Sequence, residues 1–279
     1  MKKARHIRAK SFRCARVFAA TWIAGAVLIL TLGTRATNDP DPKAVDPVVA
    51  KAQDRMERFV EEFGTMRCDE SIRQEKLKNN GNVEYHQETV YDSFVLIHFE
   101  EGKIRVFEQH REELLPHHPL AKPLVSTHGF STLAIIFHPY YAPSFRFSRL
   151  DDDSVDGKNL ARIHFEHVPG RPSPALYQKF VGDQPIDFSG TAWIDPADGS
   201  IHRIVADAGS SLKDMGLKDL RAELMYGAVT LDDESDPRWL PVSATVDLET
   251  PRQHWRNIHH FSDYRKYRAA VRLDQGAQP

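Results

Sequence analysis

The chain has 279 residues, of which 27% are charged and 41% are hydrophobic. Residues 1–36 hold eight of the 37 Lys and Arg residues and none of the 39 Asp and Glu residues, so residues 37–279 carry a formal charge of −10. An acidic domain without a basic stripe repels phosphate backbones, which argues against nucleic-acid binding. Cys68 is the one cysteine beyond residue 36, which excludes an internal disulfide in that part of the chain.

The N-terminus has the pattern of an export signal. Basic residues without any acid mark the first sixteen positions, and an almost wholly apolar run extends over residues 17–33. This order predicts a signal peptide over residues 1–36 that is cleaved after Ala36. The alternative is an uncleaved inner-membrane anchor, although the apolar run is slightly shorter than the roughly 20 residues that span a bilayer. Both alternatives place the rest of the chain in the periplasm.

A linker and a helix follow the leader. Residues 37–44 are rich in Asp and Pro and are interpreted as a linker. Apolar residues within 45–63 recur at helical spacing, with Asp46 as the N-cap, Pro47 at the first helical position and Gly64 at the end. A helix is therefore predicted here. Its apolar stripe is interpreted as a core-facing surface, because a sheet needs a covering layer.

Beyond this helix the hydrophobic period changes to the two-residue alternation of strands. About ten strands, joined by hairpin turns such as those at residues 79–82 and 196–199, predict a large antiparallel sheet with one face in water. The predicted strands lie around residues 68–78, 83–91, 104–108, 145–150, 160–167, 190–195, 201–207, 220–226, 240–248 and 255–271.

Small helices are predicted within this series of strands. Prolines interrupt the alternation over residues 113–144, where a short apolar helix is predicted near residues 130–137, and a second short helix is predicted over residues 211–217. The fold class is therefore α+β and mainly β. Residues 45–273 are expected to form a single domain, followed by a disordered tail at residues 274–279.

The pattern of titratable residues argues against catalysis and metal binding. Thirteen histidines lie beyond the leader, but adjacent pairs such as His259 and His260 point to opposite faces of a strand and cannot chelate together. The His-Glu-x-x-His, Cys-x-x-Cys and Gly-x-Ser-x-Gly motifs are absent from the sequence. The acids at 151–153 lack the pattern of a calcium loop, and those at 232–236 are interpreted as a solvated turn. No enzymatic activity, metal or cofactor is predicted.

The order of parts resembles that of the bacterial outer-membrane lipoprotein carriers, the LolA/LolB-like fold. The shared parts are the leader, the amphipathic helix, a first strand with Cys-Asp-Glu at residues 68–70 and Gln74, and a long antiparallel series with inserted helices. The resemblance covers most of residues 45–273. It implies a curved sheet, an incomplete barrel, that wraps the N-terminal helix and the inserted helices around an apolar cavity. Residues 190–195 and 255–265 also resemble uncharacterised envelope proteins of soil bacteria, notably acidobacteria.

The resemblance implies a function without catalysis, because an apolar concavity can hold an acyl chain. The chain is expected to be a carrier or sensor that binds a lipid or lipoprotein, with the leader contacting the membrane if it is uncleaved. The alternative is an envelope scaffold or regulatory module that contacts a protein partner and has no small ligand, as relatives that monitor envelope stress do. A carrier needs a hollow of several hundred Å3, whereas a scaffold can be filled solid, and apolar strand residues are core by default. The candidate lining residues are Phe137, Phe145, Phe147, Leu224, Val242, Val246 and Trp255.

Overall fold

Two compact units divide the chain, Met1–Pro42 and Lys43–Pro279. The computed structural model describes residues of the second unit only: 45–100, 103–114, 127, 129–155, 157–179, 182–208, 212–213, 216–231 and 234–267. The predicted leader, linker and C-terminal tail lie outside the described residues and stay predictions. Within the described ranges, no helix combines the length and the apolar character needed to cross a membrane.

The helix α1 (Pro47–Phe63) begins and ends at the predicted residues. The backbone N–H of Val48 donates to the Asp46 carboxylate at 2.8 Å, Pro47 occupies the first position, and Gly64 is the C-cap. This capping satisfies one of the backbone donors that every helix leaves unpaired at its N-terminus. The buried face is the predicted apolar stripe. It consists of Val48, Val49, Ala52, Met56, Phe59, Val60 and Phe63.

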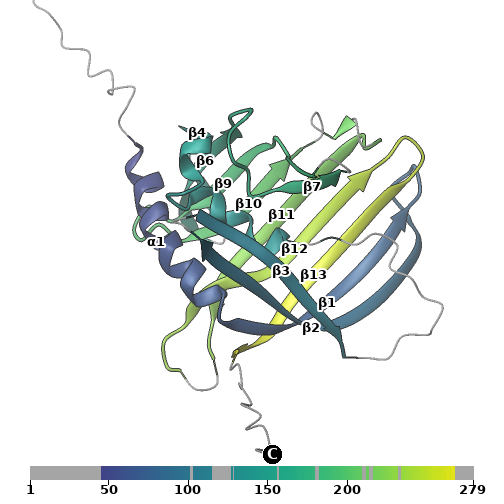
Figure 1. Cartoon of the computed structure of the whole chain (residues 1–279), viewed down its shortest axis with the longest axis horizontal. Helices are drawn as coiled ribbons and strands as arrows, with labels where there is room; N and C mark the ends of the chain where they lie inside the picture. Colours follow the sequence, from purple (N-terminus) through teal and green to yellow (C-terminus); the bar gives the residue numbers. More distant parts are fainter. Residues whose placement is uncertain are drawn as a thin grey trace, which may run out of the picture. The chain divides into compact units, whose positions relative to one another are not determined.

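One open antiparallel sheet of eleven strands dominates the fold, so the mainly β class is confirmed (Figure 1). The order is β3-β2-β1-β13-β12-β11-β10-β9-β6-β4, β5 pairs with β6, and β7 and β8 form a separate hairpin. Because β3 and β4 are its two edges, the sheet is not a closed barrel. The strands are β1 (Met66–Leu77), β2 (Val83–Glu100), β3 (Lys103–Glu113), β4 (Phe145–Arg149), β5 (Asp153–Val155), β6 (Lys158–His167), β7 (Leu176–Lys179), β8 (Gly182–Pro185), β9 (Ser189–Ile194), β10 (Ile201–Asp207), β11 (Asp219–Val229), β12 (Arg238–Glu249) and β13 (His254–Lys266).

Each predicted strand is found, but the prediction missed short elements. β5, β7 and β8 have three or four residues each, which is too few to display a two-residue alternation. The predicted helix near residues 130–137 is confirmed in place and is a 3-10 helix, η1 (Phe130–Phe137), followed by a second 3-10 turn, η2 (Ala142–Ser144). Residues 211, 214 and 215 of the helix predicted at residues 211–217 lie outside the described residues, so this helix stays a prediction.

The main core lies on the face of the sheet that contacts α1 and η1, here called the inner face. Along β11, for example, Ala222, Leu224 and Tyr226 are buried on this face while their neighbours are more exposed. Alternation of this kind follows from the pleat of a strand, in which successive side chains point to opposite sides. The sequence pattern therefore identifies the inner face correctly along the long strands.

The sequence predicts that the opposite face of the sheet is in water, but part of this face is buried. Leu160, Trp193 and Val205 form a small second cluster there. The guanidinium of Arg203 lies 4.5 Å from the centre of the Trp193 ring, and that of Arg162 lies at 5.8 Å. Two cations thus cover an aromatic side chain that would otherwise be exposed, an arrangement that cation–π attraction favours.

The turn between β9 and β10 docks on α1. The Lys51 ammonium donates to the carbonyl oxygen of Pro196 at 2.7 Å, and Arg55 forms an ion pair with Asp198 at 3.1 Å. Gly199 has φ +75°, and a Cβ at this position would lie 2.5 Å from the carbonyl carbon of Lys51. Glycine is therefore needed both for the left-handed conformation and for the close approach to the helix. This contact fixes one side of the site described next.

Candidate ligand-binding pocket

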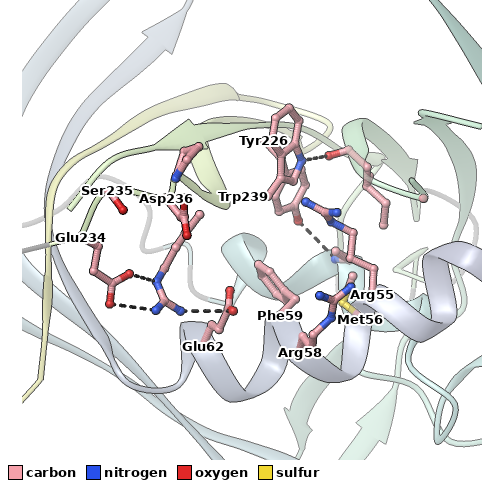
Figure 2. A pocket seen from close by; sticks show the side chains of 15 residues that line it. Arg55, Met56, Arg58, Phe59, Glu62, Tyr226, Glu234, Ser235, Asp236 and Trp239 are labelled. Carbon is pink, nitrogen blue, oxygen red and sulfur yellow. Dashed lines mark hydrogen bonds and ion pairs between the residues drawn. The ribbon is translucent and has the colours of Figure 1, made fainter. Parts of the chain in front are cut away.

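A pocket of about 650 Å3 opens between α1 and the connection from β11 to β12 (Figure 2). This volume falls within the range of about 300–1,000 Å3 that is typical of small-molecule sites. The buried part of its lining, here called the floor, is Met56, Phe59, Ala134, Ile201 and Tyr226. The charged part, here called the rim, is Arg55, Arg58, Glu62, Glu234, Asp236 and Arg238.

The floor carries no charge, and two of its five side chains are aromatic. The ring of Phe59 stacks on Phe63 with centroids 5.2 Å apart and meets Tyr226 edge-on at 6.1 Å. The Tyr226 hydroxyl accepts from the backbone N–H of Ala134 at 3.3 Å and donates to the carbonyl oxygen of Ser131 at 3.4 Å. Burial raises the pKa of Tyr226 above its ordinary value, so the phenol stays neutral.

Trp239 lines the pocket between floor and rim, and its orientation is fixed by contacts. Its indole N–H donates to the carbonyl oxygen of Ile201 at 2.7 Å. The ring of His202 lies 4.6 Å from that of Trp239, and the ammonium of Lys158 lies 5.9 Å from the centre of the Trp239 ring. A tryptophan held in this way reports on whatever enters the pocket.

A chain of ion pairs joins α1 to the sheet across the rim. Arg238 donates to both carboxylate oxygens of Glu234, at 2.6 and 2.9 Å, and lies 3.2 Å from the carboxylate of Glu62 on α1. Lys266 at the end of β13 also pairs with Glu234. Figure 2 shows the carboxylates of Glu62 and Glu234 on opposite sides of the guanidinium that pairs with both of them. The hydrogen bonds from Arg238 and Lys266 lower the pKa of Glu234 to about 2, so it remains ionised.

Two rim charges have no partner of this kind. Arg55 is paired with Asp198, and Arg238 with Glu62 and Glu234, but no ion pair or hydrogen bond of the Arg58 or Asp236 side chain is found among the residues that the structure describes. Both residues are exposed. The rim therefore presents one guanidinium and one carboxylate that a ligand can reach.

A second constellation of polar residues is buried on the inner face, on β1, β3 and β13 and at Thr127, which lies between β3 and η1. We call it the inner-face polar network; its members are Glu70, Arg111, Thr127, Asn257 and His259. Arg111 donates twice to the Glu70 carboxylate, at 2.7 Å each, and once to the carbonyl oxygen of Thr127 at 2.8 Å. His259 contacts Glu70 at 2.8 Å and the Thr127 hydroxyl at 2.9 Å, and the Asn257 amide donates to that hydroxyl at 3.0 Å.

The network holds a charged carboxylate where water is excluded. Burial by itself would raise the pKa of Glu70, but the hydrogen bonds and positive charges of His259 and Arg111 outweigh it and lower the pKa to about 2. Both ring nitrogens of His259 are engaged. The hydrogen bonds of the network therefore run among its own members.

His167, the remaining deeply buried histidine with a carboxylate partner in the described ranges, is likewise occupied. One ring nitrogen lies 2.7 Å from Asp187 and the other 3.3 Å from the carbonyl oxygen of Pro172. Within the residues that the structure describes, no three His, Cys, Asp or Glu side chains come together as a metal site would require.

Four of the seven predicted lining residues are core residues. Phe137 and Leu224 have no exposed surface, and Phe145 and Val246 are almost as buried. The structure brings three of the aromatic residues together, with Phe147, which is half-buried, 5.0 Å from Phe137 and 6.3 Å from Phe145 between ring centroids. These three rings pack against one another.

The other two predicted residues lie elsewhere on the sheet. Val242 is half-buried at an irregularity where the register between β11 and β12 shifts, and Trp255 is half-buried on β13 opposite Leu248. The 650 Å3 pocket is lined by none of the seven. Contact between these residues and a ligand stays a prediction.

The sequence did contain a signal for the rim, which its interpretation missed. Arg55, Arg58 and Glu62 are spaced three and four apart, which places them on one side of α1 beside the apolar stripe. The acids at 232–236 were interpreted as a solvated turn, whereas Glu234 and Asp236 line the pocket. Strand periodicity could not show that this loop and α1 meet.

Comparisons with known proteins find similarity only at the level of structure. The chain matches no family model, and no curated protein matches it in sequence. One structural neighbour is a DUF1329 family protein from Desulfovibrio piger, with 14% identity, a TM-score of 0.38 and coverage of 84% of this chain and 96% of that one.

Two further structural neighbours cover a similar share of the chain. A putative outer membrane lipoprotein-sorting protein domain from Vibrio parahaemolyticus is 12% identical with a TM-score of 0.42, covering 81% of this chain and 94% of its own. The MucA/MucB complex of Pseudomonas aeruginosa gives 11% identity and a TM-score of 0.19, covering 78% and 99%. Because all three TM-scores are below 0.5, these similarities carry no argument about function.

Proposed function

We propose that the protein is a non-enzymatic, exported binding protein that holds the acyl chain of a lipid or lipoprotein, as a carrier or a sensor. The observation that carries the proposal is the 650 Å3 pocket, whose floor is apolar and aromatic and whose rim is charged. An amphiphile has a matching apolar chain and a polar head. Its chain loses contact with water in the floor while its head remains at the rim.

The pocket replaces the predicted lining residues as the place where the ligand enters. A floor that includes Phe59 and Tyr226 is continuous with the main core, since both residues belong to that core. The predicted residues Phe137 and Leu224 lie deeper in the same core. In this proposal Phe137 and Leu224 support the floor. They contact the ligand only if its acyl chain is long enough to reach them.

Periplasmic localisation is part of the proposal and rests on the leader. The protein is either released by cleavage after Ala36 or held at the inner membrane by residues 17–33. The intact mass of the protein purified from a Gram-negative host distinguishes the two forms directly.

The alternative is an envelope scaffold that contacts a protein partner and takes no small ligand. It is favoured by the complete burial of Phe137 and Leu224, since a filled core needs no ligand. It is disfavoured by the size of the pocket beside α1, because a solid scaffold has no need of such a hollow.

Native mass spectrometry followed by solvent extraction tests the proposal. Full-length protein from a Gram-negative host is expected to carry one lipid per chain. Ser235→Trp introduces an indole at an exposed position of the pocket lining and should abolish this lipid while circular dichroism stays unchanged. Ser154→Trp, at an exposed position of β5, is the matched control and should keep it. A lipid-free wild type, even after incubation with total envelope lipid, would contradict the carrier and favour the scaffold.

A further inference from the structure

We propose that the pocket selects an amphiphile with a zwitterionic head, one that carries both a phosphate and an ammonium group. Arg58 receives the phosphate and Asp236 the ammonium. This inference rests on the proposed function and names the class of ligand that the site takes.

The pairing of the rim charges is the first argument. The rim has three cations and three anions, so its formal charge is balanced. Ion pairs involve Arg55, Arg238, Glu62 and Glu234, which are therefore partly or wholly neutralised within the protein. Within the described residues, the rim charges without an ion pair are one positive group, Arg58, and one negative group, Asp236, and only a ligand with both signs satisfies both of them.

The positions of the two groups are the second argument. Arg58 belongs to α1 and Asp236 to the segment that precedes β12, and Figure 2 shows these elements on different sides of the pocket. The ion-pair chain from Glu62 to Glu234 holds the two sides together. A head that carries separated charges can therefore contact both sides at once, while its chain enters the floor between them.

Side-chain chemistry fits each assignment. The planar guanidinium of Arg58 offers paired donors that match two oxygens of a phosphate. The carboxylate of Asp236 accepts hydrogen bonds and so suits an ammonium donor.

The charge of the whole exported part is the third argument. Residues 37–279 carry a formal charge of −10. The field of such a domain disfavours the approach of ligands with a net negative charge, whereas a zwitterion has none and is unaffected at long range. A head with phosphate alone is therefore a poorer ligand than one that also bears an ammonium group.

Trp239 provides a direct measurement, because it lines the pocket. Detergent-solubilised full-length protein is titrated with phosphatidylethanolamine, phosphatidylglycerol and a free fatty acid, all with the same brominated acyl chain, which quenches tryptophan fluorescence on contact. Trp239→Phe isolates the signal of the pocket from those of the other tryptophans. Phosphatidylethanolamine is expected to bind about fivefold more tightly than phosphatidylglycerol, the factor expected of one partly exposed charge pair.

Charge reversal identifies the two groups. Arg58→Glu should weaken phosphatidylethanolamine binding about fivefold, and Asp236→Lys should shift the preference toward phosphatidylglycerol. The matched controls are Arg252→Glu, in the turn after β12, and Asp151→Lys, before β5; both positions are exposed and lie outside the pocket, and neither variant should change binding.

The outcomes separate the two proposals. Equal quenching by all three brominated lipids, with no effect of either charge reversal, overturns the zwitterionic head and leaves acyl-chain binding intact. No quenching of Trp239 by any lipid overturns both. Glycerophosphoethanolamine, the same head without acyl chains, is added as a competitor. Competition as strong as that of the lipid would support the head assignment but overturn binding through the acyl chain.

Discussion

The inner face of the sheet has two halves with opposite chemistry. On β9 to β12 the inward side chains are apolar and lie under α1 and η1, as Ala192 and Leu224 do. On β1, β3 and β13 they include the charged and polar members of the inner-face polar network. Both halves show the same alternation of burial, since Cys68, Glu70 and Ile72 on β1 are all buried. Periodicity therefore tells which side chains point inward but not what they meet there.

The difference assigns different roles to the two halves. The apolar half borders the pocket and supplies its floor. The polar half closes on itself: Glu70 is buried with its oxygens occupied by Arg111 and His259. Buried charge is tolerated only when paired in this way. In the proposed function, the ligand therefore contacts the first half, and the second half is a structural network.

The largest loss of stability should come from removing one partner of the buried ion pair in the polar half. Glu70→Leu leaves the Arg111 guanidinium, which is 10% exposed, without its carboxylate. The expected loss in free energy of unfolding is about 3–5 kcal/mol, measured by urea denaturation. The double variant Glu70→Leu/Arg111→Leu should lose less than Glu70→Leu alone, because the buried guanidinium is removed together with its carboxylate partner. Additive losses would show that the pair is not coupled.

The apolar half should respond through packing alone. Leu224→Ala removes buried methyl groups and leaves a cavity, with an expected loss of about 3 kcal/mol in the free energy of unfolding. Leu96→Ala is the matched control, because Leu96 is 38% exposed, and should change stability by about 0.5 kcal/mol or less. A loss for Leu224→Ala as small as that of the control would mean that this half is not the packed core.

Lowering the pH should reduce the free energy of unfolding through the polar half, by less than the two substitutions above. The folded-state pKa of Glu70, about 2, lies below its ordinary value of 4.5. Its ionised form therefore stabilises the fold above pH 4.5, and this contribution is lost as the pH falls toward 2. At pH 3 the loss is on the order of 2 kcal/mol.

The comparison that isolates Glu70 is a pair of pH profiles of the free energy of unfolding. Leu224→Ala should show the wild-type dependence between pH 5 and pH 3, whereas Glu70→Leu/Arg111→Leu should show a weaker one. Identical profiles for wild type and double variant would place the acid sensitivity in other carboxylates.

The same two halves show how far the sequence predicts the fold. The Asp46 cap, Pro47 and the apolar stripe predicted α1 to the residue, and the alternation of Leu220 to Tyr226 and of Leu240 to Leu248 predicted β11 and β12. These are local signals, in which each residue's neighbours in sequence are its neighbours in the element. The sheet order could not be predicted, because β1 pairs with β13 across almost two hundred residues.

The sites depend on such distant pairs. Glu70 and His259 were each noted in the sequence, one in the first strand and one in a histidine pair, but nothing local indicates that they meet at 2.8 Å. The prediction that His259 and His260 point to opposite faces of a strand is confirmed, because His259 is buried and His260 is exposed. Similarly, Arg58 and Asp236 come from elements far apart in the chain, so a pocket between them cannot be inferred from either segment alone.

The smallest effect should come from an ion pair with the same chemistry as Glu70 and Arg111 but in contact with water. Arg55 and Asp198 are 28% and 53% exposed, compared with 10% and 0% for Arg111 and Glu70. Arg55→Ala should therefore cost at most about 1 kcal/mol in the free energy of unfolding. This loss should shrink as NaCl is raised, because salt screens exposed charges. Arg252→Ala is the control without an ion pair in the described residues. The expectation is that exposure, rather than the identity of the charged groups, decides what an ion pair contributes to stability in this fold. A loss for Arg55→Ala that is as large as that for Glu70→Leu and independent of salt would contradict it.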